Sequence, residues 1–379
     1  MIDATPYYAL ELWKMRRRSA DAGHLTPVPD DPDGNLLVQK LNQEFEKLQE
    51  EGHGVARWFN ETRVDTRWLT TIFERVKEAG KERLEGVTLT FVYEGMEARY
   101  AKFGQRYCEQ SQHEMSRPFV STMAAIAASG VRVKEVRISD EKGCGAIGVG
   151  RLESLAPCLK SFEAAFEGLE TLQLNLRDWR TPDLGFELER TRAPFVVRFL
   201  AKCTNVRTLE LSCYSELEAD LFREMARTCR FDRLERCRLD LFRINHISDL
   251  ITFLASSSTT LVSLHLTHVL LADLGISWAD IFTAITDTHT LLAALEMLKL
   301  ERLFTQQANG VIKRVLFANR RLQDETSLTS SLHVEGESWR DDLIERGCQY
   351  SEAEAARMWE VGVVMYPFLG LSGFVPLRL

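Results

Sequence analysis

The sequence predicts an α/β fold: a solenoid with a curved parallel sheet on one side, outer helices on the other, and a helical flank at its N-terminus. Two observations lead to this prediction. The phrase apolar-x-x-apolar-x-apolar recurs along the chain, and a stretch with helical spacing of apolar residues precedes its copies. A single strand–helix unit cannot bury its own apolar face, so units of this kind are stable when they stack side by side.

The copies lie between about residues 81 and 305. Successive copies start as few as 27 residues apart (234 to 261) and as many as 49 apart (84 to 133). The period is therefore irregular, and the longer units need inserted loops. The clear copies are LETLQL from Leu169, VRTLEL from Val206, LVSLHL from Leu261 and LEMLKL from Leu295, and weaker ones start at Leu84, Val133 and Leu234.

Helices are predicted before and between these copies. Residues 1–80 lack the phrase and predict the helical N-terminal flank, in which a turn-rich break at 27–34 precedes helical spacing over 37–48. Inside the repeats, residues 118–128 and 194–200 predict helices. Both carry apolar residues at helical spacing and open with a proline, which the first turn of a helix accommodates.

Residues 306–379 predict a C-terminal helix followed by an apolar tail. The helix is expected over residues 352–361, with Ser351 as its N-cap. Residues 361–377 contain no charge and approach the shortest length that spans a membrane as a helix. Prolines and glycines interrupt them, so a tail that covers the end of the last repeat is favoured over a membrane anchor.

Composition argues against some functions. An apolar content of 45% over 379 residues predicts a substantial core. A net charge of −8 argues against nucleic acid as a partner, because binding to phosphates needs a basic surface. The eight cysteines form no C-x-x-C pair and the N-terminus shows no signal-peptide pattern, so we expect a cytoplasmic or nuclear protein. The basic run at 14–18 is interpreted as a solvated helix end, with nuclear import as the alternative.

Catalytic chemistry has one candidate, the glycine-rich stretch Gly143–Gly148. It matches G-x-G-x-x-G and lies between a predicted strand and a predicted helix, as a phosphate-binding loop would. Residues 139–142 separate it from the strand, so a surface loop is favoured and a nucleotide-binding enzyme or hydrolase is the alternative. His265 and His268 would not share a face, so no metal site is predicted. We expect no catalytic residues and no cofactor.

The repeats resemble a known class of protein. LETLQL, VRTLEL, LVSLHL and LEMLKL, with helices between them, are similar to leucine-rich repeats, and joints such as FLAKCTNVRTLEL resemble those of fungal F-box and leucine-rich-repeat-like proteins. The resemblance implies an irregular leucine-rich-repeat solenoid and a substrate-recognition adaptor of a ubiquitin ligase.

This sequence departs from that family in two ways. Residues 1–80 lack the Leu-Pro opening of an F-box, so the adaptor would be divergent or truncated, and its N-terminal helices would have to dock the ligase. A ladder of Asn or Cys side chains is also absent, because its usual position holds Arg177, Tyr214, Phe242, Val269 and Leu303.

Strand alternation identifies the surface that the predicted sheet would present. The second and third apolar residues of each phrase point into the core, so the residue between them points outward. These outward residues are polar and mixed in charge, which suits a protein or peptide on the concave sheet face. We therefore predict a non-catalytic scaffold for protein–protein interaction. Its predicted partner-binding residues are Arg137, Gln173, Glu210, Arg238, His265 and Lys299.

Overall fold

The computed structural model of the chain is mixed α/β, with open and largely parallel sheets. It describes residues 2–3, 58, 61–90, 116–138, 147–177, 195–213, 221–273, 276–287, 291–307, 309–318, 328–336, 338–346 and 348–351.

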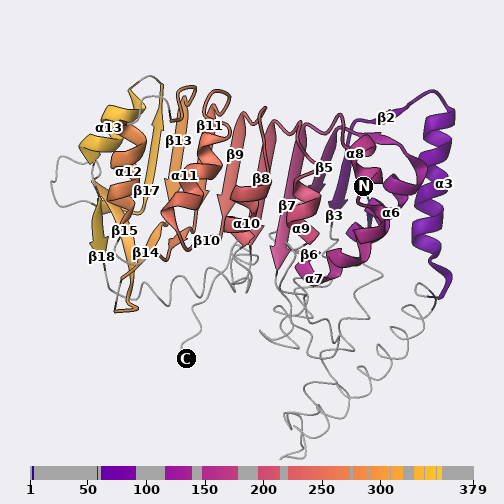
Figure 1. The fold of residues 1–379 in the computed structure, drawn as a ribbon, viewed down its shortest axis with the longest axis horizontal. Coiled ribbons are helices and arrows are strands. Elements are labelled where there is room, and N and C mark those ends of the chain that lie inside the picture. The colour runs from indigo at the N-terminus through magenta and orange to yellow at the C-terminus, as the bar shows by residue number, and fades with distance from the viewer. Residues whose placement is uncertain are drawn as a thin grey trace, which may run out of the picture.

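The main sheet consists of strands that lie side by side in chain order (Figure 1). Each sequence phrase supplies one of its parallel strands, and a final antiparallel strand, β17, pairs with the last of them. The short strands β1 (Ile2–Asp3) and β6 (Ile147–Gly148) add to β3 and β7. The principal strands are β3 (Val87–Thr90), β5 (Glu135–Ile138), β7 (Thr171–Arg177), β8 (Thr208–Cys213), β9 (Arg236–Asp240), β11 (Ser263–Thr267), β13 (Met297–Glu301) and β17 (Ser331–Glu335).

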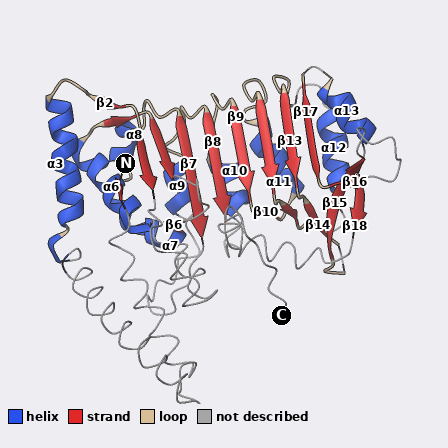
Figure 2. Cartoon of the chain, turned by 180° about the vertical axis from the view of Figure 1, so that it is seen from behind, coloured by secondary structure: helices blue, strands red, loops and turns tan. Residues whose placement is uncertain are grey.

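Helices cover one face of this sheet, and Figure 2 shows the strands from the opposite side with the helices behind them. The predicted helices at 118–128 and 194–200 are confirmed as α6 (Ser116–Ser129) and α9 (Phe195–Leu200). The other helices on this side are α7 (Val149–Leu152), η2 (Glu153–Cys158), α8 (Ser161–Ala165), α10 (Leu221–Thr228), α11 (Ile247–Ala255) and α12 (Trp278–Asp287).

The core lies between these helices and the sheet. In each phrase the second and third apolar residues are buried as predicted; Leu172 and Leu174 of β7 are both fully buried. Aromatic side chains fill the helix side, where the Phe199 ring meets the rings of Phe119 and Phe162 edge-on at 6.1 and 5.4 Å between centroids. Edge-to-face contacts of this kind stabilise by about 1 kcal/mol beyond the burial itself.

A corner follows strands β9, β11 and β13 and leads the chain into a second sheet. The first residue of each corner has a left-handed backbone: Leu241 (φ 60°), His268 (φ 48°) and Arg302 (φ 49°). Its N–H donates to the chain of the next unit, as Leu241 does to the Thr267 carbonyl at 3.0 Å. The corners therefore stack on one another. They lead into the parallel strands β10 (Arg243–Ile244), β12 (Leu270–Leu271) and β14 (Phe304–Gln306).

Apolar residues occupy the position that follows each left-handed residue. Phe242, Val269 and Leu303 are buried. The Phe242 and Val269 carbonyls accept hydrogen bonds from the backbone N–H groups of Leu270 and Phe304, at 2.8 and 2.9 Å. The backbone N–H groups of one corner thus satisfy the carbonyl groups of the corner before it, which would otherwise need a polar side chain as a partner. This pairing gives a physical reason for the missing Asn or Cys ladder.

At the N-terminal end, helix α3 (Val64–Glu78) packs against α6 through a buried carboxylate. Asp65 accepts hydrogen bonds from the Ser121 hydroxyl at 2.7 Å and from Arg117 Nε at 3.3 Å. The ion pair matters here because an unpaired buried charge is strongly destabilising. The strands β2 (Arg83–Leu84) and β4 (Arg132–Val133) form a small parallel pair beside these helices. Residues 27–34 and 37–48 lie outside the described part of the chain.

The C-terminal region differs from its prediction. Residues 312–351 form strands and a helix that sequence reasoning missed, and β17 continues the main sheet in the antiparallel sense. The sequence signal for β17 is the alternation of polar and apolar residues over Ser331–Glu335. In the structure Leu332 and Val334 are buried, and the other three residues of the strand are exposed. The predicted helix at 352–361 and the tail after it lie outside the described residues. The new elements are β15 (Ile312–Ala318), β16 (Leu328–Thr329), β18 (Gln349–Ser351) and α13 (Trp339–Arg346).

Two neighbouring residues of β8 provide a test of this arrangement. Leu209→Ala should lower the free energy of unfolding by about 2–5 kcal/mol, because it leaves a cavity in the core. Glu210→Ala, on the opposite face of the same strand, should change it by less than about 0.5 kcal/mol. Urea denaturation of both variants measures the difference, and similar losses in both would contradict the assignment of faces.

Candidate functional site

The face of the main sheet opposite the helices is the candidate site, and we call it the open sheet face. No described helix or strand covers it (Figure 2), but its residues on β7, Thr171, Gln173 and Asn175, are buried. Its central residues lie directly opposite one another in neighbouring strands, which confirms the predicted register. We call this line the middle row: Thr88, Arg137, Gln173, Glu210, Arg238, His265, Lys299 and, on β17, His333.

All six predicted partner-binding residues fall in the middle row. Gln173, Glu210 and Arg238 are consecutive partners across β7, β8 and β9. His265 and Lys299 continue the row on β11 and β13. Arg137 pairs with Thr88, and the pairing of its neighbour Val136 with Leu172 places Arg137 beside Gln173. The structure brings the six together, while their role in binding stays a prediction.

Two further rows flank the middle row. We call the residues two positions earlier in each parallel strand the leading row, and those two positions later the trailing row. On the antiparallel β17, Glu335 falls in the leading row and Ser331 in the trailing row. The leading row contains Glu135, Thr171, Thr208, Arg236, Ser263 and Met297; the trailing row contains Asn175, Ser212, Asp240, Thr267 and Glu301.

Most charges on the open sheet face are paired within one strand. Arg137 Nε lies 3.0 Å from Glu135 Oε2, and Lys299 Nζ lies 2.8 Å from Glu301 Oε1. Arg238 Nη2 lies 3.6 Å from Asp240 Oδ2. Residues two apart on a strand share a face, so each pair neutralises itself within its strand, and in the Arg238 pair the acid Asp240 is buried. The pair His333–Glu335 on β17 follows the same rule, at 2.8 Å.

Glu210 and Arg236 are the exceptions among the described residues of the three rows. The Glu210 carboxylate forms no ion pair or hydrogen bond there. The Arg236 guanidinium donates only to the Thr208 hydroxyl, from Nε at 3.1 Å and Nη2 at 2.9 Å, and has no carboxylate partner. The two side chains come from adjacent strands, β8 and β9. The open sheet face therefore carries one acid and one base whose charges are not compensated locally.

His265 sits among charged neighbours in the second half of the middle row. Its Nε2 lies 2.7 Å from the Thr267 hydroxyl and 3.4 Å from Glu301 Oε2. Burial lowers the pKa of the His265 imidazole below its ordinary value, and the cations Lys299 and Arg238 lower it further. Burial works to raise the pKa of the Glu301 carboxyl, but Lys299 and His265 outweigh it and lower the pKa.

A buried chain of polar groups at the end of these strands was missed by sequence reasoning. Asp240 and His268 are nearly inaccessible, and Asp240 Oδ1 lies 3.3 Å from His268 Nδ1. Arg302 Nη1 lies 3.1 Å from His268 Nε2. Because a guanidinium only donates, Nε2 accepts this bond and Nδ1 donates to Asp240. The left-handed corners bring the three residues together, and no sequence motif indicates a left-handed backbone at these residue types.

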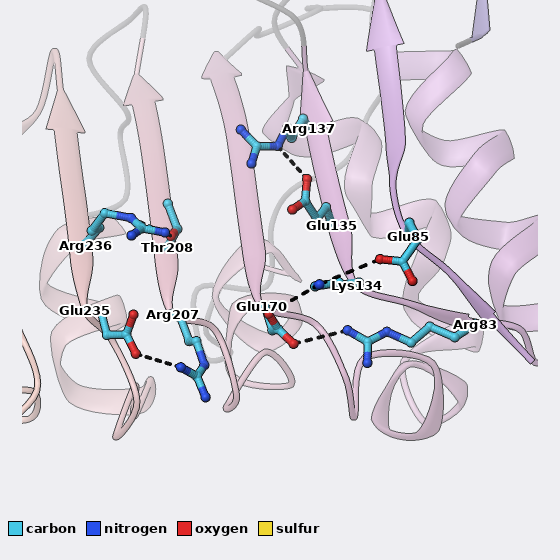
Figure 3. A network of polar contacts seen from close by, with 10 residues as sticks. All are labelled: Arg83, Glu85, Lys134, Glu135, Arg137, Glu170, Arg207, Thr208, Glu235 and Arg236. Atoms are coloured by element: carbon cyan, nitrogen blue, oxygen red, sulfur yellow. Dashed lines mark hydrogen bonds and ion pairs between the residues drawn. The ribbon is translucent and has the colours of Figure 1, made fainter.

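At the start of the strands, charges of alternating sign form a rim along the sheet (Figure 3). Glu170 lies 3.1 Å from Arg83 and 3.9 Å from Lys134, and Arg207 lies 2.9 Å from Glu235. These side chains are partly exposed to water, so each pair contributes under about 1 kcal/mol. The backbone beneath them is more important for the fold. The Arg207 carbonyl, for example, accepts hydrogen bonds from the N–H groups of both Glu235 and Arg236 at 2.9 Å.

Other candidate chemistries find limited support. Gly148 precedes α7, a helix of four residues, and its N–H already donates to the Ser116 hydroxyl at 2.8 Å. Gly143–Ala146 lie outside the described residues, so the nucleotide-site alternative stays a prediction. Burial raises the pKa of the Cys229 and Cys237 thiols to about 12, which leaves them protonated and unreactive at neutral pH.

Two kinds of feature are absent from the described residues. These residues contain no cluster of three or more His, Cys, Asp or Glu side chains arranged to hold a metal ion. Within the same ranges, no helix has both the length and the apolar character needed to cross a membrane.

No protein-family model matches this chain, and no curated protein matches it significantly.

The environment of His265 leads to a prediction for its protonation. NMR titration of the imidazole should give a pKa below 6.5, and Lys299→Met should raise it by removing a neighbouring cation. Lys160→Met, on the helix side, is the matched control and should leave it unchanged. A pKa at or above 6.5 in the unaltered protein would contradict this account.

The lowered pKa of His265 also determines how the stability of the protein should change with pH. The unfolded ring takes up its proton at higher pH than the folded ring, so the unfolded state binds more protons just below pH 6.5. The free energy of unfolding should therefore rise with pH through this window, and His265→Gln should remove that contribution.

Proposed function

We propose that this chain is a non-catalytic scaffold that binds another protein or peptide on its open sheet face. The observation that carries the proposal is the middle row, in which polar residues of successive strands lie in register on a face that no described helix or strand covers. Mixed charges in a continuous row suit a protein surface, because complementary charges align a partner and reject incorrect ones.

We further propose that the stacked units form an irregular leucine-rich-repeat solenoid. Supporting this are the one-to-one match of sequence phrases to parallel strands and the corners that repeat after β9, β11 and β13. By its resemblance to F-box and leucine-rich-repeat-like proteins, we propose the chain as a divergent or truncated substrate-recognition adaptor of a ubiquitin ligase. In that role, its N-terminal helices would replace the F-box in docking the ligase.

A triple variant tests the open sheet face. Replacing Arg137 and Arg238 by Glu and Glu210 by Lys should abolish the recovery of a partner that co-purifies with the intact protein, because like charges would then oppose one another across the interface. Affinity purification with mass spectrometry measures this, and it also shows whether a ligase adaptor subunit is recovered. The matched control places the same charge changes on the helix side: Glu78→Lys, Lys160→Glu and Arg227→Glu. Equal partner recovery from both triple variants would contradict the proposal.

The nucleotide-binding alternative has its own test. A nucleotide bound at Gly143–Gly148 and supplied at a hundred times its dissociation constant would stabilise the fold by about 2.7 kcal/mol. The scaffold proposal expects no change in the melting temperature with ATP, GTP, NAD or NADP. A clear rise that Gly145→Val removes would favour the enzyme instead.

A further inference from the structure

We infer that the partner of the open sheet face is an α-helix lying across strands β8 to β13, with a basic residue over Glu210 and an acidic residue over Arg236. This inference rests on the proposed function and specifies the shape and charge of the partner. Two independent features of the face lead to it: the spacing of the middle row and the two charges that are not compensated locally.

The spacing distinguishes a helix from an extended chain. Neighbouring strands lie about 4.8 Å apart, so Glu210, Arg238, His265 and Lys299 form four contact points along about 14 Å. A helix returns side chains to one face every 3.6 residues, or about 5.4 Å, so its mismatch over this distance is about 2 Å. Flexible side chains absorb a difference of that size.

An extended segment laid in the same direction fits poorly. It returns side chains to one face every second residue, about 6.7 Å apart, so over the same three intervals its mismatch reaches about 6 Å. That exceeds the spacing between strands, so its side chains would fall between contact points. If it ran along a strand instead, it would meet few residues of the middle row. The register therefore favours residues i, i+4, i+7 and i+11 of a helix.

The charges set the sequence that such a helix needs. Glu210 has no cationic partner among the described residues, so it favours a Lys or Arg at position i. Arg236 has no carboxylate partner and donates only to the Thr208 hydroxyl, so it favours an acid at i+4. Lys299, two strands further on, is already paired with Glu301 at 2.8 Å, so position i+11 needs no acid. Between them, at i+7, an uncharged residue faces His265.

The neighbouring residues support the same placement. Within β9 to β13, the leading row offers Arg236, Ser263 and Met297, whereas the acids Asp240 and Glu301 lie in the trailing row. A helix with an acidic side chain at i+4 is therefore attracted toward the leading-row side. Met297 is 37% exposed there, so it offers an apolar contact beside position i+11.

Selection from two libraries tests the inference. One library displays a single-helix miniprotein randomised at positions i, i+4, i+7 and i+11, and the other displays linear peptides without helical structure. Both are selected on the full-length chain, and the dissociation constants of the enriched binders are measured. We expect binders from the helical library that carry a base at i and an acid at i+4. Glu210→Lys or Arg236→Glu should weaken them at least about tenfold, because like charges are then opposed.

Reversing the charge both on the protein and on the helix makes the test specific. A helix with an acid at i should regain affinity for the Glu210→Lys variant, whereas Arg227→Glu on α10 should have no effect. If the enriched binders are linear peptides that still depend on Glu210 and Arg236, the helix inference is wrong and the proposed function stands. If no binder from either library depends on the open sheet face, both are wrong.

Discussion

The structure depends on one constraint, the in-phase pairing of successive parallel strands. From β7 to β13, each strand pairs with the next so that equivalent positions of the repeated phrase lie opposite one another. Outward residues therefore meet outward residues, and buried apolar residues meet buried apolar residues. The backbone enforces this phase at the start of the strands, where one carbonyl accepts two N–H groups from the next unit, as Glu170 does from Arg207 and Thr208. A slip by one residue would place Leu209 and Leu211 on the surface.

This constraint explains why the main sheet and its outward row could be predicted from the sequence. The phrase contains two apolar residues separated by one, and that spacing alone determines which side chain of a strand points outward. Even the weak copy beginning at Leu234, which has Cys237 in place of a leucine, forms a strand in register with its neighbours, because a buried thiol serves as a small apolar group.

Other parts of the structure could not be predicted because they depend on backbone geometry or long-range contact. The left-handed corners include Leu241 and Arg302, residue types that rarely adopt that conformation, and the histidine of the third corner, His268, is no signal by itself, so the polar chain through Asp240 could not be predicted. The antiparallel β17 was missed for another reason: its alternation is clear, but its partner β13 is set by tertiary contact. The charges of Glu210 and Arg236 were visible in the sequence, whereas their lack of partners was not.

The strand β17 also determines how the sheet ends. The earlier principal strands are all parallel to one another, whereas β17 runs in the opposite direction at the end of the described sheet. Its exposed residues include His333 and Glu335, and ionisable side chains on a terminal strand disfavour pairing with a neighbouring molecule. The same strand that extends the open sheet face thus disfavours edge-to-edge pairing between molecules.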